Sequence, residues 1–438
     1  MDRKIEKSLS RVRDRIATME SMLEHFEQNP TDMTHLYKPV IKNIIRQESR
    51  TIECVETDEP FLASEFTTPV EIMTAMDIHW YFHIERVFST GGIADPYIIE
   101  DLDAVEELPL PSDICPVAKL TFYYLHIGVL PRPTAYISMV HPCDPISSMH
   151  SAYMHHPEWR DVPMFVPDPP YNLDDRSLHY YADELKRTVE FITRHTGKTL
   201  DLGRLKEAVE ETNKGYLLWH EYNYLRRSMP TPHGSGLPRA CVSMLLTEGA
   251  GNPEHGQLSW FQDVVDDAET RVRESRPEVP NQKIRVLWFD FLPVYVDELI
   301  PWLEEEWGAV IVMEMTSYCP FKLIDTSTEE TIFFGLAERA LQHPVMVRQS
   351  HSTVDTTLGD LTRIVKDFKM DCVIFPGHMG HKDQNAYASL LKESCRELGV
   401  PFLNIGLNNF DVRYTSVDEI KDRISQFFTA MGLAYASP

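Results

Sequence analysis

Apolar residues recur at two kinds of spacing along the 438-residue chain. In residues 3–27 they recur every three or four positions, which predicts an amphipathic helix that ends at the turn-forming NPTD. Short helical patterns then alternate with the apolar runs TAYISMV (134–140) and VPMFV (162–166), which predict strands. Long helical patterns fill residues 176–229, and a further helix is expected over 258–274.

From Lys283 onward the alternation of strand and helix patterns is regular. The expected strands are IRVLWFD, AVIVMEMT, CVIFPG and PFLNIGL, and an amphipathic helical pattern follows each of them. Strands that are apolar throughout predict a parallel sheet covered by helices on both faces. We therefore expect an α/β protein with two doubly wound, Rossmann-like parallel-sheet domains, an N-terminal helix and a helical insertion.

These patterns predict four consecutive segments. They are an N-terminal helical segment (1–50), a first α/β domain (51–175), a helical segment with a linker (176–280), and a C-terminal doubly wound α/β domain (281–438).

Charge and cysteine content exclude several classes of function. A formal net charge of −25 argues against a nucleic-acid partner, which would need a basic face. No run of 18 apolar residues and no apolar signal region occurs, so neither a membrane span nor export is expected, and the protein is expected to be cytoplasmic. Seven cysteines without a C-x-x-C pair indicate reduced thiols and argue against a structural zinc finger.

The residues with chemical potential follow the ends of predicted strands. Ligands of open α/β sheets lie beyond the carboxyl ends of the strands. His378 and His381 follow CVIFPG, Cys143 follows TAYISMV, and Cys319 follows VIVMEMT. Cys115 begins a predicted helix, where the positive end of the helix dipole favours a thiolate. By contrast, Cys372 begins a strand and Cys395 falls within a helix, so we expect both in the core.

Structural explanations compete with each of these interpretations. The paired histidines could equally cap the following helix, and a cysteine in an apolar stretch is more often a small hydrophobe than a ligand. The chain has no G-x-G-x-x-G after a strand and no G-x-x-x-x-G-K-[ST], so it is not expected to bind a dinucleotide or to hydrolyse ATP itself. A zinc hydrolase or lyase with His378, His381 and Cys143 as ligands remains open.

The sequence resembles the subunits of 2-hydroxyacyl-CoA dehydratases and benzoyl-CoA reductases over most of its length. The resemblance is strongest over residues 368–432, where CVIFPGHMGHKDQ, GVPFL and DVR stand in the family's closing order. VEIMTAMDIHWYFHIE resembles the family's early helix and strand, and ICPVAKL and HPCDPISSM resemble its first two cysteine motifs.

The resemblance implies a [4Fe-4S] cluster held between two α/β domains and a homologous, cluster-bearing sister subunit. It also implies partner ATPase activator subunits with their own iron–sulfur cluster, and an acyl-CoA thioester substrate that is reduced by single electrons. Cys115 and Cys143 match the family's first two cluster cysteines. The third lies in the loop GHMGHKDQ, where this chain has His381.

Three arrangements of the third ligand follow from this difference. His381 binds iron through nitrogen, Cys319 supplies a third thiolate, or His378 and His381 act as proton donors beside the cluster. We expect a cluster held by Cys115, Cys143 and either His381 or Cys319, with the two histidines as catalytic residues.

The resemblance leaves several functions to compare. Chain length, the histidine-containing loop and the closing FFTAMGL favour an ATP-coupled, ferredoxin-dependent oxidoreductase of the benzoyl-CoA reductase type. The alternatives are a subunit of a (R)-2-hydroxyacyl-CoA dehydratase, which is a lyase, the zinc enzyme, and a scaffold subunit without a cluster.

Overall fold

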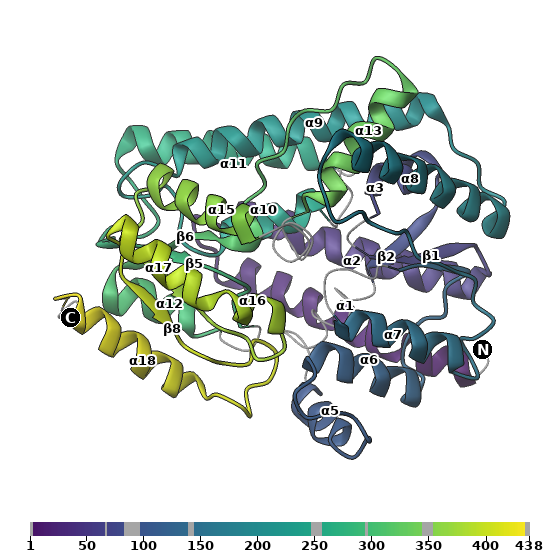
Figure 1. Cartoon of the computed structure of the whole chain (residues 1–438), viewed down its shortest axis with the longest axis horizontal. Helices are drawn as coiled ribbons and strands as arrows, with labels where there is room; N and C mark the ends of the chain where they lie inside the picture. Colours follow the sequence, from purple (N-terminus) through teal and green to yellow (C-terminus); the bar gives the residue numbers. More distant parts are fainter. Residues whose placement is uncertain are drawn as a thin grey trace. The chain divides into compact units, whose positions relative to one another are not determined.

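The structure contains two four-stranded parallel sheets (Figure 1). It is a computed structural model that describes residues 3–65, 68–82, 97–138, 144–246, 256–293, 297–343 and 354–433. The first sheet has the order β2-β1-β3-β4, and the second has the order β6-β5-β7-β8. The expected α/β class with two Rossmann-like parallel sheets is thereby confirmed.

The strands are short, and those of the second sheet lie within the apolar runs of the sequence. Those of the first sheet are β1 (Phe61–Ser64), β2 (His79–Phe82), β3 (Ala135–Ile137) and β4 (Met164–Phe165). Those of the second sheet are β5 (Ile284–Trp288), β6 (Ala309–Glu314), β7 (Cys372–Phe375) and β8 (Phe402–Asn404).

The helices fall before, between and after these strands. In the first two-thirds of the chain they are α1 (Arg3–Gln28), α2 (Thr34–Thr57), α3 (Val70–Ala75), α5 (Ile98–Val105), α6 (Pro116–Ile127), α7 (Asp144–His155), α8 (Asp175–Thr196), α9 (Leu202–Leu225), α10 (Leu237–Leu246) and α11 (Gln257–Glu274). In the last third they are α12 (Leu299–Trp307), α13 (Glu329–Leu341), α15 (Val354–Asp367), α16 (Lys382–Ala386), α17 (Ala388–Leu398) and α18 (Val417–Ala430). In the part of the chain that the structure describes, no helix is both long and apolar enough to cross a membrane.

The chain forms two compact units, each assembled from three chain segments. Unit 1 comprises Met1–Tyr216, Val242–Trp260 and Phe321–His343, and unit 2 comprises Leu217–Cys241, Phe261–Pro320 and Pro344–Pro438. The four consecutive segments expected from the sequence stay a prediction. Helix α13, which the alternation of patterns placed with the C-terminal strands, packs against α8 in unit 1.

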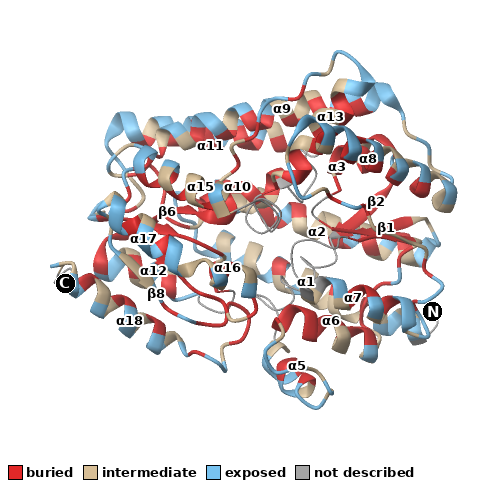
Figure 2. Ribbon diagram, in the orientation of Figure 1, coloured by how far each residue is buried: buried red, intermediate tan, exposed pale blue. Residues whose placement is uncertain are grey.

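The second sheet is buried on both faces because its side chains alternate between two apolar cores. Trp288 and Ile374 lie in one core with residues of α12 and α18, while Leu287 and Val373 lie in the other with residues of α15 and α17. All residues of β5, β6 and β7 are buried, and Figure 2 shows β6 in red. Cys372 and Cys395 are fully buried in these cores, which confirms their structural reading.

The first sheet places β1 in its centre, paired with β2 and β3 in parallel register. Helices α1 and α2 pack against each other, and α2 also contacts β2. The periodicity of residues 3–27 predicted α1 within a residue at its carboxyl end. One long helix expected after residue 384 is instead divided into α16 and α17 at Tyr387.

A buried ion pair in unit 2 gives a prediction about acid stability. Burial raises the pKa of the Asp267 carboxyl, but hydrogen bonds from His233 and Arg271 outweigh burial and lower it to about 2. The His233 Nε2–Asp267 Oδ2 distance is 2.8 Å. A carboxyl group with a lowered pKa stabilises the fold above its unfolded-state pKa, and this contribution is lost as the pH falls through the folded-state pKa.

Replacing Asp267 by asparagine should therefore lower the free energy of unfolding at pH 7 by about 2 kcal/mol. The difference from the unmodified chain should shrink between about pH 4 and pH 2. Urea unfolding at several pH values measures this, and Asp263→Asn, an exposed position on the same helix, is the control. An equal urea midpoint for Asp267→Asn and Asp263→Asn at pH 7 would contradict the prediction.

Candidate functional site

The carboxyl ends of the four strands of unit 2 bring buried polar side chains to one edge of the sheet. Glu314 ends β6, Asp290 follows β5, His378 and His381 follow β7, and Asn409 follows β8. All five are at least nine-tenths buried. Because the strands are parallel neighbours, their carboxyl ends meet at the same edge, where ligands of such sheets bind.

His378 is fully buried and its ring is fixed by the backbone of the loop after β8. The backbone N–H of Asn409 donates to its Nδ1 over 3.1 Å. Burial, together with the neighbouring His381, lowers the pKa of His378 well below its usual value, so the ring is neutral. Since Nδ1 accepts a hydrogen bond, the proton of the neutral ring lies on Nε2. Among the described residues, this buried Nε2 has no hydrogen-bond partner.

His381 lies beside His378 but has the opposite electrostatic setting. The two rings are 4.6 Å apart between centroids and are perpendicular. Burial disfavours the charged ring of His381, but the carboxylate of Asp290, 3.3 Å from its Nδ1, outweighs burial and raises the pKa. The amide of Gln384, oriented with its nitrogen toward Asp290, donates to both carboxylate oxygens. The site therefore combines a neutral imidazole donor with an imidazole that holds a proton more tightly.

A glycine and an asparagine fix the backbone conformation of the loop between β7 and α16. Gly377 has φ +62°, and a Cβ there would lie 2.5 Å from Asn404 Oδ1. Asn385 donates its side-chain N–H to the carbonyl oxygens of His378 and His381, over 2.7 and 3.1 Å. The glycine and the asparagine together hold the two histidines in place.

Glu314 adds a second acidic group to the same sheet edge. Its Oε1 accepts the backbone N–H of Leu292 over 3.1 Å, and burial raises its pKa. Neither Glu314, Asp290 nor Asn409 was predicted as a site residue. A signal existed for the first two, because each stands at the end of an apolar strand, as the histidines do.

The predicted cysteine ligands lie in separate parts of the chain. Cys115 precedes the first turn of α6 in unit 1 and is buried, and Cys319 is buried in unit 2 after a short 3₁₀ turn (Met315–Ser317). Cys143 lies outside the described residues. Within the described ranges, no group of three or more histidine, cysteine, aspartate or glutamate side chains is placed to hold a metal ion. The predicted ligand set Cys115, Cys143 and His381 stays a prediction.

Unit 1 has polar side chains at the carboxyl edge of its own sheet. Glu65, which follows β1, accepts the hydroxyl of Tyr136 over 2.6 Å, and both side chains are buried. Ser138, which follows β3, is hydrogen-bonded to His150 Nε2 of α7. Burial, with the neighbouring Glu65, raises the pKa of Tyr136 well above its usual value. The residues at this edge come before Cys143 in the sequence. None of them was predicted as a site residue.

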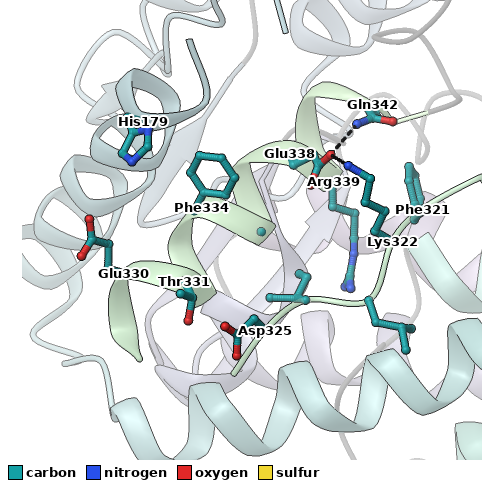
Figure 3. A pocket seen from close by; sticks show the side chains of 13 residues that line it. His179, Phe321, Lys322, Asp325, Glu330, Thr331, Phe334, Glu338, Arg339 and Gln342 are labelled. Carbon is teal, nitrogen blue, oxygen red and sulfur yellow. Dashed lines mark hydrogen bonds and ion pairs between the residues drawn. The ribbon is translucent and has the colours of Figure 1, made fainter. Parts of the chain in front are cut away.

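A hollow of about 390 Å³ in unit 1 lies along α13 (Figure 3). One ion pair lies within it: Lys322 Nζ is 2.9 Å from Glu338 Oε1, and Gln342 donates to the same oxygen over 3.3 Å. Arg339, which also lines it, is bound to Glu71. The lining has three carboxylates, from Asp325, Glu330 and Glu338, and two cations, so it offers no excess of positive charge to an anionic ligand.

Residues 65–431 match the family model described as 2-hydroxyglutaryl-CoA dehydratase, D-component. The chain therefore belongs to this family. No curated protein matches the chain.

Proposed function

We propose that this chain is a cluster-bearing subunit of an enzyme that reduces an acyl-CoA thioester by one-electron chemistry, of the benzoyl-CoA reductase type. The observation that carries the proposal is the pair of buried imidazoles beyond β7, of which one is a neutral donor and the other holds its proton. Family membership supports the thioester substrate, a sister subunit and an ATPase that supplies low-potential electrons.

The donor types present fit an iron–sulfur cluster. Cys115 offers a buried thiol at the positive end of α6, which favours the thiolate. The cluster would be held by Cys115, Cys143 and a third ligand, either His381 or Cys319. When bound, such a cluster supplies single electrons at low potential, shielded from water.

The residues of unit 2 would orient the thioester, donate a hydrogen bond to it and supply a proton. His378 Nε2–H would donate a hydrogen bond to the thioester oxygen, where negative charge develops when an electron is added. His381, whose pKa the carboxylate of Asp290 raises, would deliver a proton to the reduced acyl group. Phe410 packs perpendicular to His378, with ring centroids 5.1 Å apart, and helps to exclude water.

The second candidate is radical dehydration of a 2-hydroxyacyl-CoA, and the description of the matching family favours it. In that reaction His381 would protonate the leaving hydroxyl group. The two reactions separate in an anaerobic assay of the reconstituted complex with benzoyl-CoA and with a (R)-2-hydroxyacyl-CoA. The reductase consumes electrons in proportion to product, whereas the dehydratase needs only a catalytic amount.

Iron and acid-labile sulfide, measured per chain on protein purified without oxygen, test the proposal first. Matching iron and sulfide that are lost in Cys115→Ala and Cys143→Ala support it. Zinc without sulfide would favour a hydrolase or lyase, and no metal at all would favour a scaffold subunit.

The role of His381 needs its own test, because a nitrogen that binds metal cannot also carry a proton. We infer the proton-holding role from the contact with Asp290. His381→Gln should then lower activity roughly 100-fold or more and leave iron and sulfide unchanged. If His381 is instead the third ligand, His381→Gln should lose iron, and His381→Cys should keep it.

A further inference from the structure

A second hollow in unit 1 lies at the amino end of β2, away from the carboxyl edge where reacting groups are expected. Its volume is about 300 Å³, within the usual range of small-molecule sites. The lining residues are Arg46, Gln47, Arg50, Met73, Thr74, Asp77, Ile78, His79, Trp80 and Arg204.

The lining is rich in guanidinium groups. Arg46 and Arg50 stand one turn apart on α2, and Arg204 stands in the first turn of α9. Asp77 is the single carboxylate among the lining residues. Three guanidinium groups and one carboxylate thus line the hollow, in a chain with a formal net charge of −25, and Glu53 and Glu59 pair with Arg50 from outside the lining. Guanidinium groups bind phosphate oxygens in pairs of parallel hydrogen bonds.

The ion pairs of these arginines differ in strength. Arg50 is held by Glu59 and Glu53, over 2.5 and 2.9 Å. Arg204 lies 3.6 Å from Asp77, and both of these side chains are largely exposed. A loose, exposed pair contributes little, so an incoming anion can replace Asp77 as the partner of Arg204.

The floor of the hollow is preformed and partly apolar. His79 is buried and its Nε2 is hydrogen-bonded to Thr51 Oγ1 over 2.8 Å. Met73, Ile78 and Trp80 are buried and line the same hollow. The site therefore offers apolar surface next to positive charge, which suits a small molecule that carries a phosphate group on an organic body.

We propose that this hollow binds a phosphate-bearing small molecule other than the thioester substrate. The guanidinium groups and the exposed Arg204–Asp77 pair favour a phosphate, and the hollow lies at the amino end of β2, opposite the carboxyl edge of the same sheet. The proposal does not depend on the reaction that the protein catalyses.

Calorimetric titration of the full chain with pyrophosphate and with AMP, at constant ionic strength, tests the proposal. Both probes should bind saturably, and Arg204→Ala should weaken the affinity roughly tenfold through loss of a charge-assisted contact. Lys206→Ala is the matched control, because it removes the same charge from the same helix at a position outside the lining. It should change the affinity less than twofold.

A competition experiment with coenzyme A distinguishes a separate phosphate-bearing ligand from the nucleotide part of the thioester substrate. Pyrophosphate binding that coenzyme A does not displace supports a separate ligand. Displacement by coenzyme A, with a dependence on Arg204, would place the nucleotide of the substrate in the hollow and overturn the proposal. Unsaturable binding, or an equal effect of Arg204→Ala and Lys206→Ala, would also overturn it.

Discussion

Replacing His378 by asparagine should lower the turnover number of the assembled enzyme by roughly 100- to 1000-fold, the cost of removing one donor to a developing oxyanion. The asparagine side-chain oxygen can take the place of Nδ1 and accept the Asn409 N–H, so the loop should keep its conformation. Asparagine cannot supply the N–H donor that His378 has at Nε2. In the native structure this Nε2 has no hydrogen-bond partner among the described residues. Turnover of the reconstituted complex measures the effect.

The glutamine variant at the same position is the matched comparison. Its amide nitrogen reaches the place of Nε2 but leaves the Asn409 N–H without its acceptor. His378→Gln should therefore keep more turnover and lose more stability than His378→Asn. The opposite order, with turnover following the urea midpoint in both variants, would show that His378 has a purely structural role.

Replacing Arg339 by methionine should lower the free energy of unfolding by about 3–5 kcal/mol, because it leaves a carboxylate buried without its cation. Arg339 Nη1 lies 2.7 Å from Glu71 Oε1, and their side chains are only 9% and 3% exposed. Arg339 also donates to Asn213 over 3.0 Å and covers the ring of Tyr216, with Cζ 4.6 Å from the ring centroid. Urea unfolding followed by circular dichroism measures the loss.

A double variant separates the buried charge from the lost packing. Glu71→Gln combined with Arg339→Met removes both charges and should recover part of the stability lost in Arg339→Met. Lys322→Met is the control, because Lys322 is 80% exposed and pairs only across the rim of the hollow along α13. If the double variant is no more stable than Arg339→Met, the buried charge is not the cause.

Hydrophobic periodicity predicted helix α1 and the strands of unit 2 because their buried positions recur at a regular spacing along the chain. The strands of unit 2 are apolar throughout since both of their faces are covered, and α1 shows a clear stripe. Helix α2 and strand β1 were not predicted. Pro39 interrupts the pattern of α2, and the four residues of β1 are too few to show a period.

The candidate site was predicted in part for a related reason. The rule that ligands lie beyond the carboxyl ends of parallel strands selected His378 and His381, whose rings are neighbours after β7 in the structure; their role as site residues stays a prediction. Asp290 was not predicted, although its position after an apolar strand is the same signal that selected the histidines. Its role depends on a contact across 91 positions of sequence, which periodicity does not reveal.

The division of unit 1 into three chain segments constrains how the protein is made. Helix α13 packs against α8 in unit 1. Strands β1, β2 and β3 of the same unit, however, end about 190 residues before α13 begins in the sequence. During synthesis, unit 1 must therefore wait, with the carboxylate of Glu71 uncompensated, until Arg339 has left the ribosome. Partial chains that end between residues 217 and 320 should consequently be bound by chaperones or degraded, whereas release of the whole chain lets both units close.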